Sequence, residues 1–148
     1  MIDSMSLAGV THGEHFERVG VVADARTASQ TRDEFVCWLH DAFYLAPHRA
    51  RDLALATYEA LANCAEFAYV SKGLTGTMDI RASFDPDSSA LSVIVSDRGL
   101  WRTAAPTPGD RTRGRGIAIM TAVADDASIQ TSMRGTTVRL TWTDVQRR

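Results

Sequence analysis

The spacing of hydrophobic residues predicts one strand and two helices in the first half of the chain. The run from Phe16 to Ala23 is rich in valine and favours a strand. Residues up to about 42 then carry a hydrophobic stripe at steps of three and four, which is typical of an amphipathic helix, and Asp24 or Thr27 is placed to cap its first turn. After a break before Pro47, a second helix is expected over about residues 48–68.

The hydrophobic period changes to two after residue 76. Residues 77–84 alternate and residues 91–96 are largely apolar, so the two runs predict a hairpin around a turn at 85–89. Residues 102–113 contain two prolines and a glycine and predict a long loop. The glycine turn 114–116 should then open a short helix over 117–124, and strands are expected over 127–132 and 136–143 around a turn at 133–135.

This order of elements predicts an α+β fold, because the strands cluster in hairpins and do not alternate with helices. We expect a single-domain, two-layer α/β sandwich with helices on one face of a mixed, mostly antiparallel sheet. The domain should occupy residues 16–143, between a flexible N-terminal tail at 1–15 and a C-terminal tail at 144–148.

Composition narrows the classes of protein to consider. The chain has 148 residues, 45% of them hydrophobic, a net charge of −2 and a pI near 6.0. No global positive charge is present to bind nucleic acid directly. No membrane span or signal peptide is evident, and Cys37 and Cys64 lie in apolar helical contexts without CxxC spacing. We therefore expect a cytoplasmic protein with reduced thiols.

Two polar residues stand out in the second helix. Glu59 and Asn63 lie four apart among alanines and leucines, so they share one helical face. Taken alone, they are at least as well explained by a glutamate that caps the helix or forms a salt bridge and by a hydrogen-bonded asparagine. The functional interpretation is an amide oxygen that binds Mg²⁺ and a carboxylate that activates a hydroxyl for attack on a phosphoryl group.

Glycine-containing corners follow several predicted elements. They are Asp97-Arg98-Gly99, Gly114-Arg115-Gly116 and Arg134-Gly135-Thr136-Thr137. Each alone is explained by an ordinary turn or helix cap, although a glycine turn before a helix also suits an anion. The arginines of the intervening region (Arg98, Arg102, Arg111, Arg113 and Arg115) form either a solvated loop or a flap over phosphates. No P-loop motif is present.

Together and in this order, these motifs resemble the Bergerat-fold ATPases, the GHKL or histidine-kinase-like group. The resemblance covers about residues 16–143 and is closest to the anti-sigma-factor serine kinases of bacteria. Residues 59–63 match the N-box, 95–99 the first glycine box, 114–120 the second and 135–138 the last.

The resemblance implies a role for each matched residue. Glu59 would be the catalytic base and Asn63 would hold Mg²⁺ beside ATP or ADP. Asp97 would receive the adenine amino group, Gly99 would let the ring approach, and Thr137 would back the adenine pocket. The implied phosphate-side residues are Arg113, Gly114, Arg115, Gly116 and Ile117.

The resemblance also implies an activity and partners. The protein would bind a sigma factor, phosphorylate a serine or threonine of an anti-anti-sigma (STAS domain) partner, and form a homodimer through its first strand and helix. Phe67 stands where many relatives have histidine, and the first glycine box lacks a second glycine. An alternative is therefore an ATP- or ADP-binding regulator without phosphotransfer. The catalytic half of a histidine kinase is disfavoured, because no histidine lies in a phospho-acceptor hairpin.

Overall fold

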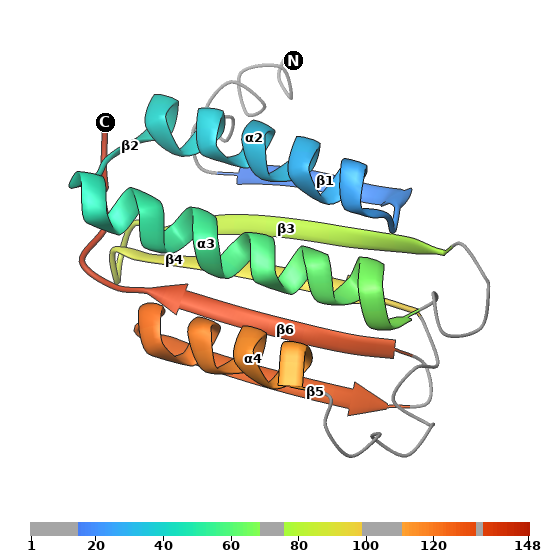
Figure 1. The fold of residues 1–148 in the computed structure, drawn as a ribbon. Helices are drawn as coiled ribbons and strands as arrows, with labels where there is room; N and C mark the ends of the chain where they lie inside the picture. The colour runs from blue at the N-terminus through green and yellow to red at the C-terminus, as the bar shows by residue number, and fades with distance from the viewer. Residues whose placement is uncertain (1–14, 69–75, 99–110, 133–134) are drawn as a thin grey trace.

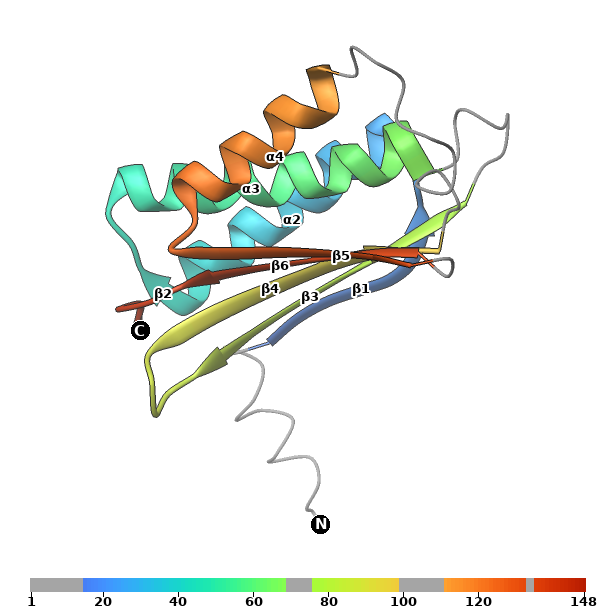
Figure 2. The ribbon, with the colours of Figure 1, turned by 90° about the horizontal axis from the view of Figure 1, so that it is seen from below.

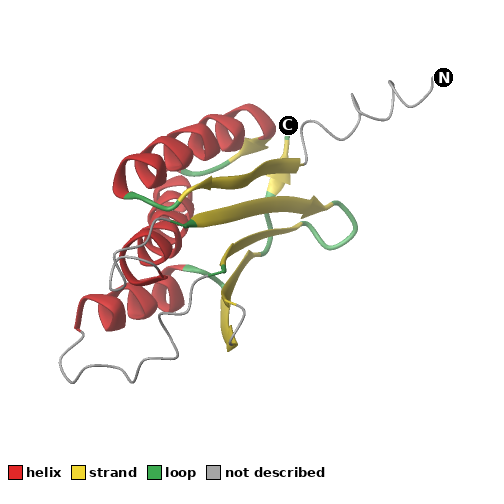
Figure 3. Ribbon diagram, turned by 90° about the vertical axis from the view of Figure 1, so that its right-hand side faces the viewer, coloured by secondary structure: helices red, strands yellow, loops and turns green. Residues whose placement is uncertain are grey.

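The computed structural model describes residues 15–68, 76–98, 111–132 and 135–148. In this part of the chain, a five-stranded sheet carries three α-helices on one face (Figures 1 and 2). Figure 3 shows the same two layers from the side, with helices and strands on opposite sides. The predicted two-layer α+β sandwich is therefore confirmed.

The predicted strands and helices are present in the expected order. The described elements are β1 (His15–Val22), α2 (Ala25–Ala42), β2 (Phe43–Tyr44), α3 (Pro47–Asn63), a π-helical turn η1 (Cys64–Ala68), β3 (Thr77–Asp85), β4 (Ala90–Asp97), α4 (Arg111–Val123), β5 (Asp126–Ser132), β6 (Gly135–Trp142) and β7 (Gln146–Arg147). Of these, β2, η1 and β7 were not predicted. The main sheet has the order β1-β3-β4-β6-β5, and each neighbouring pair is antiparallel. The short strands β2 and β7 form a separate pair.

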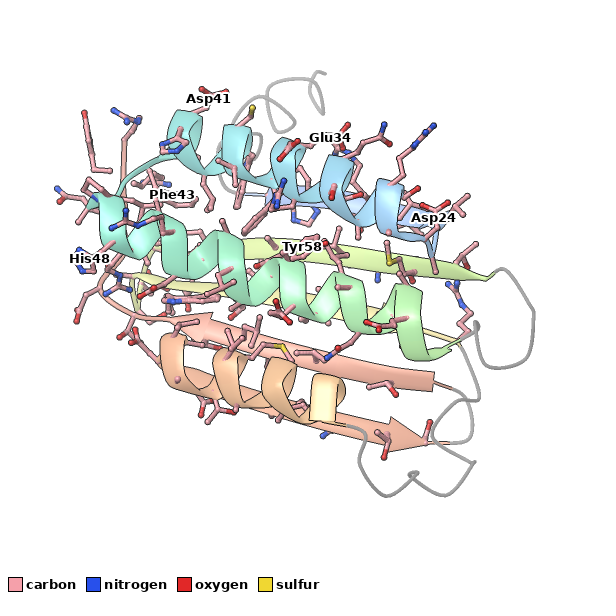
Figure 4. All side chains as sticks on the ribbon, viewed as in Figure 1. Asp24, Glu34, Asp41, Phe43, His48 and Tyr58 are labelled. Carbon is pink, nitrogen blue, oxygen red and sulfur yellow. The ribbon has the colours of Figure 1, made fainter. Side chains whose placement is uncertain are left out.

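Local chemistry sets the helix starts. The Asp24 carboxylate accepts a 2.8 Å hydrogen bond from the Thr27 amide and caps α2. Asp24 was one of the two residues predicted to cap this helix. Asp24 and Asp41 mark the two ends of this helix in Figure 4. Pro47 takes the first position of α3, where its missing N–H costs nothing.

The helix α3 lies between α2 and α4 and packs against the middle of the sheet (Figure 1). Its buried face consists of Leu53, Ala56, Thr57, Ala60 and Leu61. Because three of these side chains are small, the helix axis can approach the sheet closely. The sheet contributes fully buried residues of β3, β4 and β6, which are Met78, Ile80, Ala82, Leu91, Val93, Val95 and Leu140.

The C-terminal segment is part of the packed fold. Val145 is 3% exposed, and its amide donates to the Ser89 carbonyl at 3.0 Å. The Arg148 amide donates to the Ala42 carbonyl at 2.8 Å, just beyond β7. Residues 144–148, expected to form a tail, therefore attach α2 and the β3–β4 turn to the end of the chain.

The start of α4 differs from the sequence expectation. The helix begins at Arg111, so residues 114–116 lie inside it and do not form a turn before it. A helix leaves its first four amides without intrahelical partners. In α4 these are the amides of residues 111–114, six residues earlier than the glycine pattern predicts. Most of the predicted loop at 102–113 lies outside the described residues, as does the tail before His15.

Candidate active site

Several element ends meet at one end of the sheet. The carboxyl end of α3, the end of β4 and the start of β6 lie at the right of Figure 1, and α4 lies beside β5 and β6 below them. A cavity of about 20 Å³, enough for about one water molecule, lies among them. It is lined by Ala60, Asn63, Cys64, Asp97, Ile117, Ile129, Thr136 and Val138. Three of the predicted site residues, from α3, β4 and α4, are thus brought to one place.

A second hollow lies at the opposite end of the sheet. It is wider, about 450 Å³, and open to solvent between the β3–β4 turn and the C-terminal segment. None of the predicted site residues lines it. The smaller cavity is therefore the candidate site.

The helix α3 contributes the polar pair to this site. Asn63 lines the cavity, and Glu59 lies one turn earlier and is half-buried. Burial first, and the neighbouring Glu66 carboxylate second, raise the pKa of Glu59 above its ordinary value. The regular helix then gives way to the π-helical turn η1, a feature often found at functional sites.

Asp97 is the carboxylate at the floor of the cavity. It is the last residue of β4 and is 5% exposed. The Thr136 amide donates to its Oδ1 at 3.4 Å, and Cys64 lines the same cavity. Asp97 therefore places a buried carboxylate among the side chains that line the cavity.

The structure places Thr136, and not Thr137, beside Asp97. Thr136 is 5% exposed and lines the cavity, whereas Thr137 pairs with Ser96 and Gln130 along the sheet. Side chains alternate between the two faces of a strand, so Thr137 faces away from the helices. The signal was available in the sequence, since Val138 and Leu140 mark the core face and Thr136 is in phase with them.

The structure describes only some of the residues that were predicted to bind the phosphates. Ile117 lines the cavity from α4. Arg113, Gly114, Arg115 and Gly116 belong to the first two turns of the same helix. Gly99 lies outside the described residues.

Arg98, one of the arginines considered for a flap over phosphates, forms an ion pair with Asp79. Its guanidinium contacts the Asp79 Oδ2 at 3.1 Å and the Thr77 Oγ1 at 3.0 Å. The other oxygen of Asp79 accepts from the Gly20 amide at 2.7 Å, where the register of β1 shifts. The Arg98 side chain therefore connects the end of β4 to β3, and Asp79 of β3 also holds the edge strand β1.

The side chains at the cavity have the chemistry that recognises a nucleobase, and the cavity itself, at about 20 Å³, holds about one water molecule. Asp97 and the Thr136 hydroxyl present an acceptor and a hydroxyl group to a base, between the apolar side chains of Ile117, Ile129 and Val138. No group of three or more His, Cys, Asp or Glu residues that could hold a metal occurs in the described part of the chain. One amide oxygen suits Mg²⁺, which takes its other ligands from water and phosphates.

Comparisons with known proteins agree with this fold. The family profile of the histidine kinase-like ATPase domain matches residues 21–142. The crystal structure of the RsbU and RsbW domains of Rv1364c from Mycobacterium tuberculosis is similar, with a TM-score of 0.68 and 22% identity over 90% of this chain and 33% of that chain. At this identity the likeness shows the fold alone, and our chain spans about a third of that protein.

A second solved structure is more distant. The histidine kinase domain of the blue-light activated histidine kinase EL346 from Erythrobacter litoralis gives a TM-score of 0.47 and 18% identity, over 64% of this chain and 47% of that one. No curated protein matches the chain. Among the described residues, no helix is long and apolar enough to span a membrane.

Proposed function

The chain belongs to the histidine kinase-like ATPase family, and we propose that it is an ATP-dependent serine/threonine protein kinase that acts as an anti-sigma factor. The observation that carries this proposal is the meeting of Asn63 and Asp97 at one cavity, with Glu59 one helical turn away. The four motifs support the family as a whole, and the resemblance of the sequence to the anti-sigma-factor serine kinases favours that type within it.

Each residue has a distinct task in this proposal. Asp97 accepts a hydrogen bond from the exocyclic amine of adenine, and the Asn63 amide oxygen binds Mg²⁺ on the phosphates. Bound ATP with Mg²⁺ supplies the phosphoryl group. Glu59 takes the proton from a serine or threonine hydroxyl of the partner. The oxygen of that hydroxyl then bonds to the γ-phosphorus, and ADP leaves.

The environment of Glu59 suits a general base. Burial and the Glu66 carboxylate raise the pKa of Glu59 towards the working pH. A base whose pKa lies nearer the working pH holds a transferred proton better and still remains mostly ionised before transfer.

The proposed partners are a sigma factor, an anti-anti-sigma protein with a STAS domain, and a second copy of this chain, all in the cytoplasm. Support for a homodimer comes from β1, an edge strand of the main sheet with Val19 49% exposed and Val22 44% exposed. Unpaired strand edges with apolar side chains favour pairing with another chain. Sedimentation at several protein concentrations tests this point.

The test of the function combines nucleotide titration with phosphotransfer. The full chain is titrated with ATP and ADP with and without Mg²⁺, then incubated with labelled ATP and candidate anti-anti-sigma proteins. Asn63→Ala should remove the Mg²⁺ dependence of ATP binding, and Asp97→Asn should weaken both nucleotides. Glu34→Gln changes an exposed glutamate of α2 that does not line the cavity; it is the matched control and should still transfer phosphate.

The outcomes separate two functions. Transfer to a serine or threonine that requires Glu59 supports the kinase. Nucleotide binding without transfer to any candidate supports a nucleotide-dependent binding module, the alternative considered from the sequence. Unchanged Mg²⁺ dependence in Asn63→Ala would show that the metal ligand is assigned wrongly.

A further inference from the structure

A third hollow lies on the outer side of the helical layer, between α2 and α3. Its volume is about 470 Å³, and it is open to solvent. One lining residue comes from α2 and the others from α3; they are Arg32, Arg51, Asp52, Ala54, Leu55 and Tyr58. None of them lines the cavity beside Asp97. The nucleotide site therefore does not explain this hollow, which we call the α2–α3 groove.

The floor of the α2–α3 groove is apolar. Leu55 is 41% exposed and is the single large hydrophobic residue that the described helices leave exposed. Tyr58 follows it by three residues, so the two side chains are neighbours on the surface of α3. The Arg32 guanidinium lies 5.1 Å from the centre of the Tyr58 ring and borders the groove on the α2 side (Figure 4). A partner that covers Leu55 and Tyr58 would gain the free energy of apolar burial.

The charges at the rim favour an acidic partner. Asp52 is the one acidic residue of the lining, against two arginines. Arg32 already holds the Asp33 carboxylate at 3.0 Å. Arg51 is exposed and forms no hydrogen bond or ion pair with the residues that the structure describes. The Arg51 guanidinium can therefore bind a carboxylate that a partner supplies.

The groove leads along α3 to the proposed general base. Arg51, Leu55 and Glu59 are spaced by four residues, so they follow one another on the surface of the helix. At 1.5 Å per residue, Leu55 lies about 6 Å and Arg51 about 12 Å along the helix axis from Glu59. A protein that brings a hydroxyl to Glu59 therefore has the groove within reach of its neighbouring side chains.

We propose that the α2–α3 groove is the docking surface for the protein that accepts the phosphate, and that it recognises an apolar side chain and a carboxylate near the accepting serine or threonine. The apolar side chain covers Leu55 and Tyr58, and the carboxylate pairs with Arg51. In an extended segment, at about 3.3 Å per residue, the two groups would lie roughly two and four residues from the accepting residue. This inference rests on the proposed kinase activity and adds the chemistry of its protein substrate.

The experiment uses the full chain, labelled ATP and the anti-anti-sigma protein that takes the label in the transfer assay. Transfer is measured against acceptor concentration, and ATP affinity by calorimetry. We expect Leu55→Ala and Arg51→Glu each to raise the KM for the acceptor about three- to tenfold, with kcat and ATP affinity as in the wild type. Arg139→Glu makes the same charge change at an exposed position of β6, between two residues that face the core, and is the matched control with an unchanged KM. Thermal unfolding confirms that each variant is folded.

A charge exchange tests the carboxylate directly. Acidic residues of the acceptor near its labelled hydroxyl are replaced by lysine, one at a time. One of these changes should raise the KM of the wild-type chain and lower that of Arg51→Glu. If none restores transfer by Arg51→Glu, Arg51 does not bind a carboxylate of the acceptor and the inference fails.

The outcomes distinguish the docking surface from the kinase activity. An unchanged KM in both Leu55→Ala and Arg51→Glu, or an equal rise in Arg139→Glu, would overturn the docking surface and leave the kinase intact. A wild-type chain that binds ATP but labels no anti-anti-sigma protein would instead overturn the proposed kinase, and the docking surface with it.

Discussion

Gly135 lies so close to the end of β4 that a Cβ atom on it would overlap the main-chain carbonyl oxygen of Asp97. The same Cβ would lie 2.9 Å from the Asp97 carbonyl carbon and 3.0 Å from the Arg98 Cα. Gly135 also has a φ of +147°, which residues with a side chain rarely adopt. Glycine here lets β6 begin directly against the residue that carries the buried carboxylate.

Gly135→Ala should therefore damage both the fold and the site. Because the overlap is with main-chain atoms, β4 or β6 has to move, and we expect a loss of at least about 2 kcal/mol in the free energy of unfolding. ATP affinity should fall at least about tenfold, a loss equivalent to 1.4 kcal/mol, since Asp97 shifts with its backbone. Urea unfolding and calorimetry measure the two effects.

Gly20→Ala is the control for this substitution. Gly20 has a φ of +70°, but a Cβ there would have no neighbour within 4 Å. Its cost should be the backbone strain alone, about 1–2 kcal/mol, with ATP affinity unchanged. If the two alanine variants lowered ATP affinity equally, the close approach of Gly135 to Asp97 would not be the cause of the loss of affinity.

Glu59→Gln should separate binding from phosphotransfer. Glutamine keeps the shape of the side chain but takes no proton, so transfer should fall at least about 100-fold while ATP affinity stays nearly unchanged. A radiolabel assay and calorimetry measure these quantities. A variant that transfers phosphate at the wild-type rate would show that Glu59 is not the base.

Glu59→Gln should also change how the stability of the fold depends on pH. Burial raises the folded-state pKa of Glu59, so its protonated form favours the folded state. That contribution is complete below the ordinary pKa of 4.5 and is lost as the pH rises through the raised value. Glu59→Gln should thus be slightly more stable than wild type at neutral pH, by about 0.5 kcal/mol or less after solvent screening. Urea unfolding at pH 4 and pH 7.5 tests the sign.

Asp125→Asn should weaken the corner between α4 and β5. The Asp125 Oδ2 accepts from the Thr143 amide at 2.8 Å and from its hydroxyl at 3.1 Å, and it pairs with Arg49 at 3.4 Å. We expect a loss of about 0.5–1 kcal/mol at neutral pH. Asp33→Asn, whose carboxylate is 70% exposed beside Arg32, is the control and should change stability by less than about 0.5 kcal/mol.

The effect of Asp125 should vanish in acid. The hydrogen bond from the Thr143 amide is the main cause that lowers the pKa of Asp125 below its ordinary value of 3.8. A lowered acid pKa stabilises the fold above the ordinary value, and this stabilisation is lost as the pH falls through the folded-state pKa. Unfolding curves of wild type and Asp125→Asn should therefore converge below pH 3.8. A constant difference across pH would contradict this assignment.

Asp79→Ala should release the edge strand β1. Its carboxylate, 8% exposed, accepts from the Gly20 amide and pairs with Arg98. Removal deprives the Gly20 amide of a hydrogen bond to a charged group, at a cost of about 1.5–3 kcal/mol. Hydrogen exchange at Gly20 should become faster. Glu17→Ala removes the exposed ion pair between Glu17 and Arg81 on the same two strands and should cost less than about 1 kcal/mol, with exchange at Gly20 unchanged.

Local patterns predicted most of the elements because helices and strands have different hydrophobic periods. The start of α4 was wrong because glycine was interpreted as the residue that precedes a helix, whereas residues 114 and 116 lie within it. Glycine disfavours a helix interior by only about 1 kcal/mol, which helix packing can outweigh. The C-terminal segment was missed because two-residue strands such as β7 carry no period.

By itself, the sequence determined the two-layer α+β class and the shared helical face of Glu59 and Asn63, since both depend on spacing along one element. Only the tertiary structure decided that Cys64 and Thr136 flank Asp97, and that Arg98 binds Asp79. Those contacts join residues from different elements, so they depend on strand register and on how closely α3 packs on the sheet. For the same reason Thr136 replaces Thr137 at the cavity: a shift of one residue along a strand moves a side chain to the opposite face of the sheet.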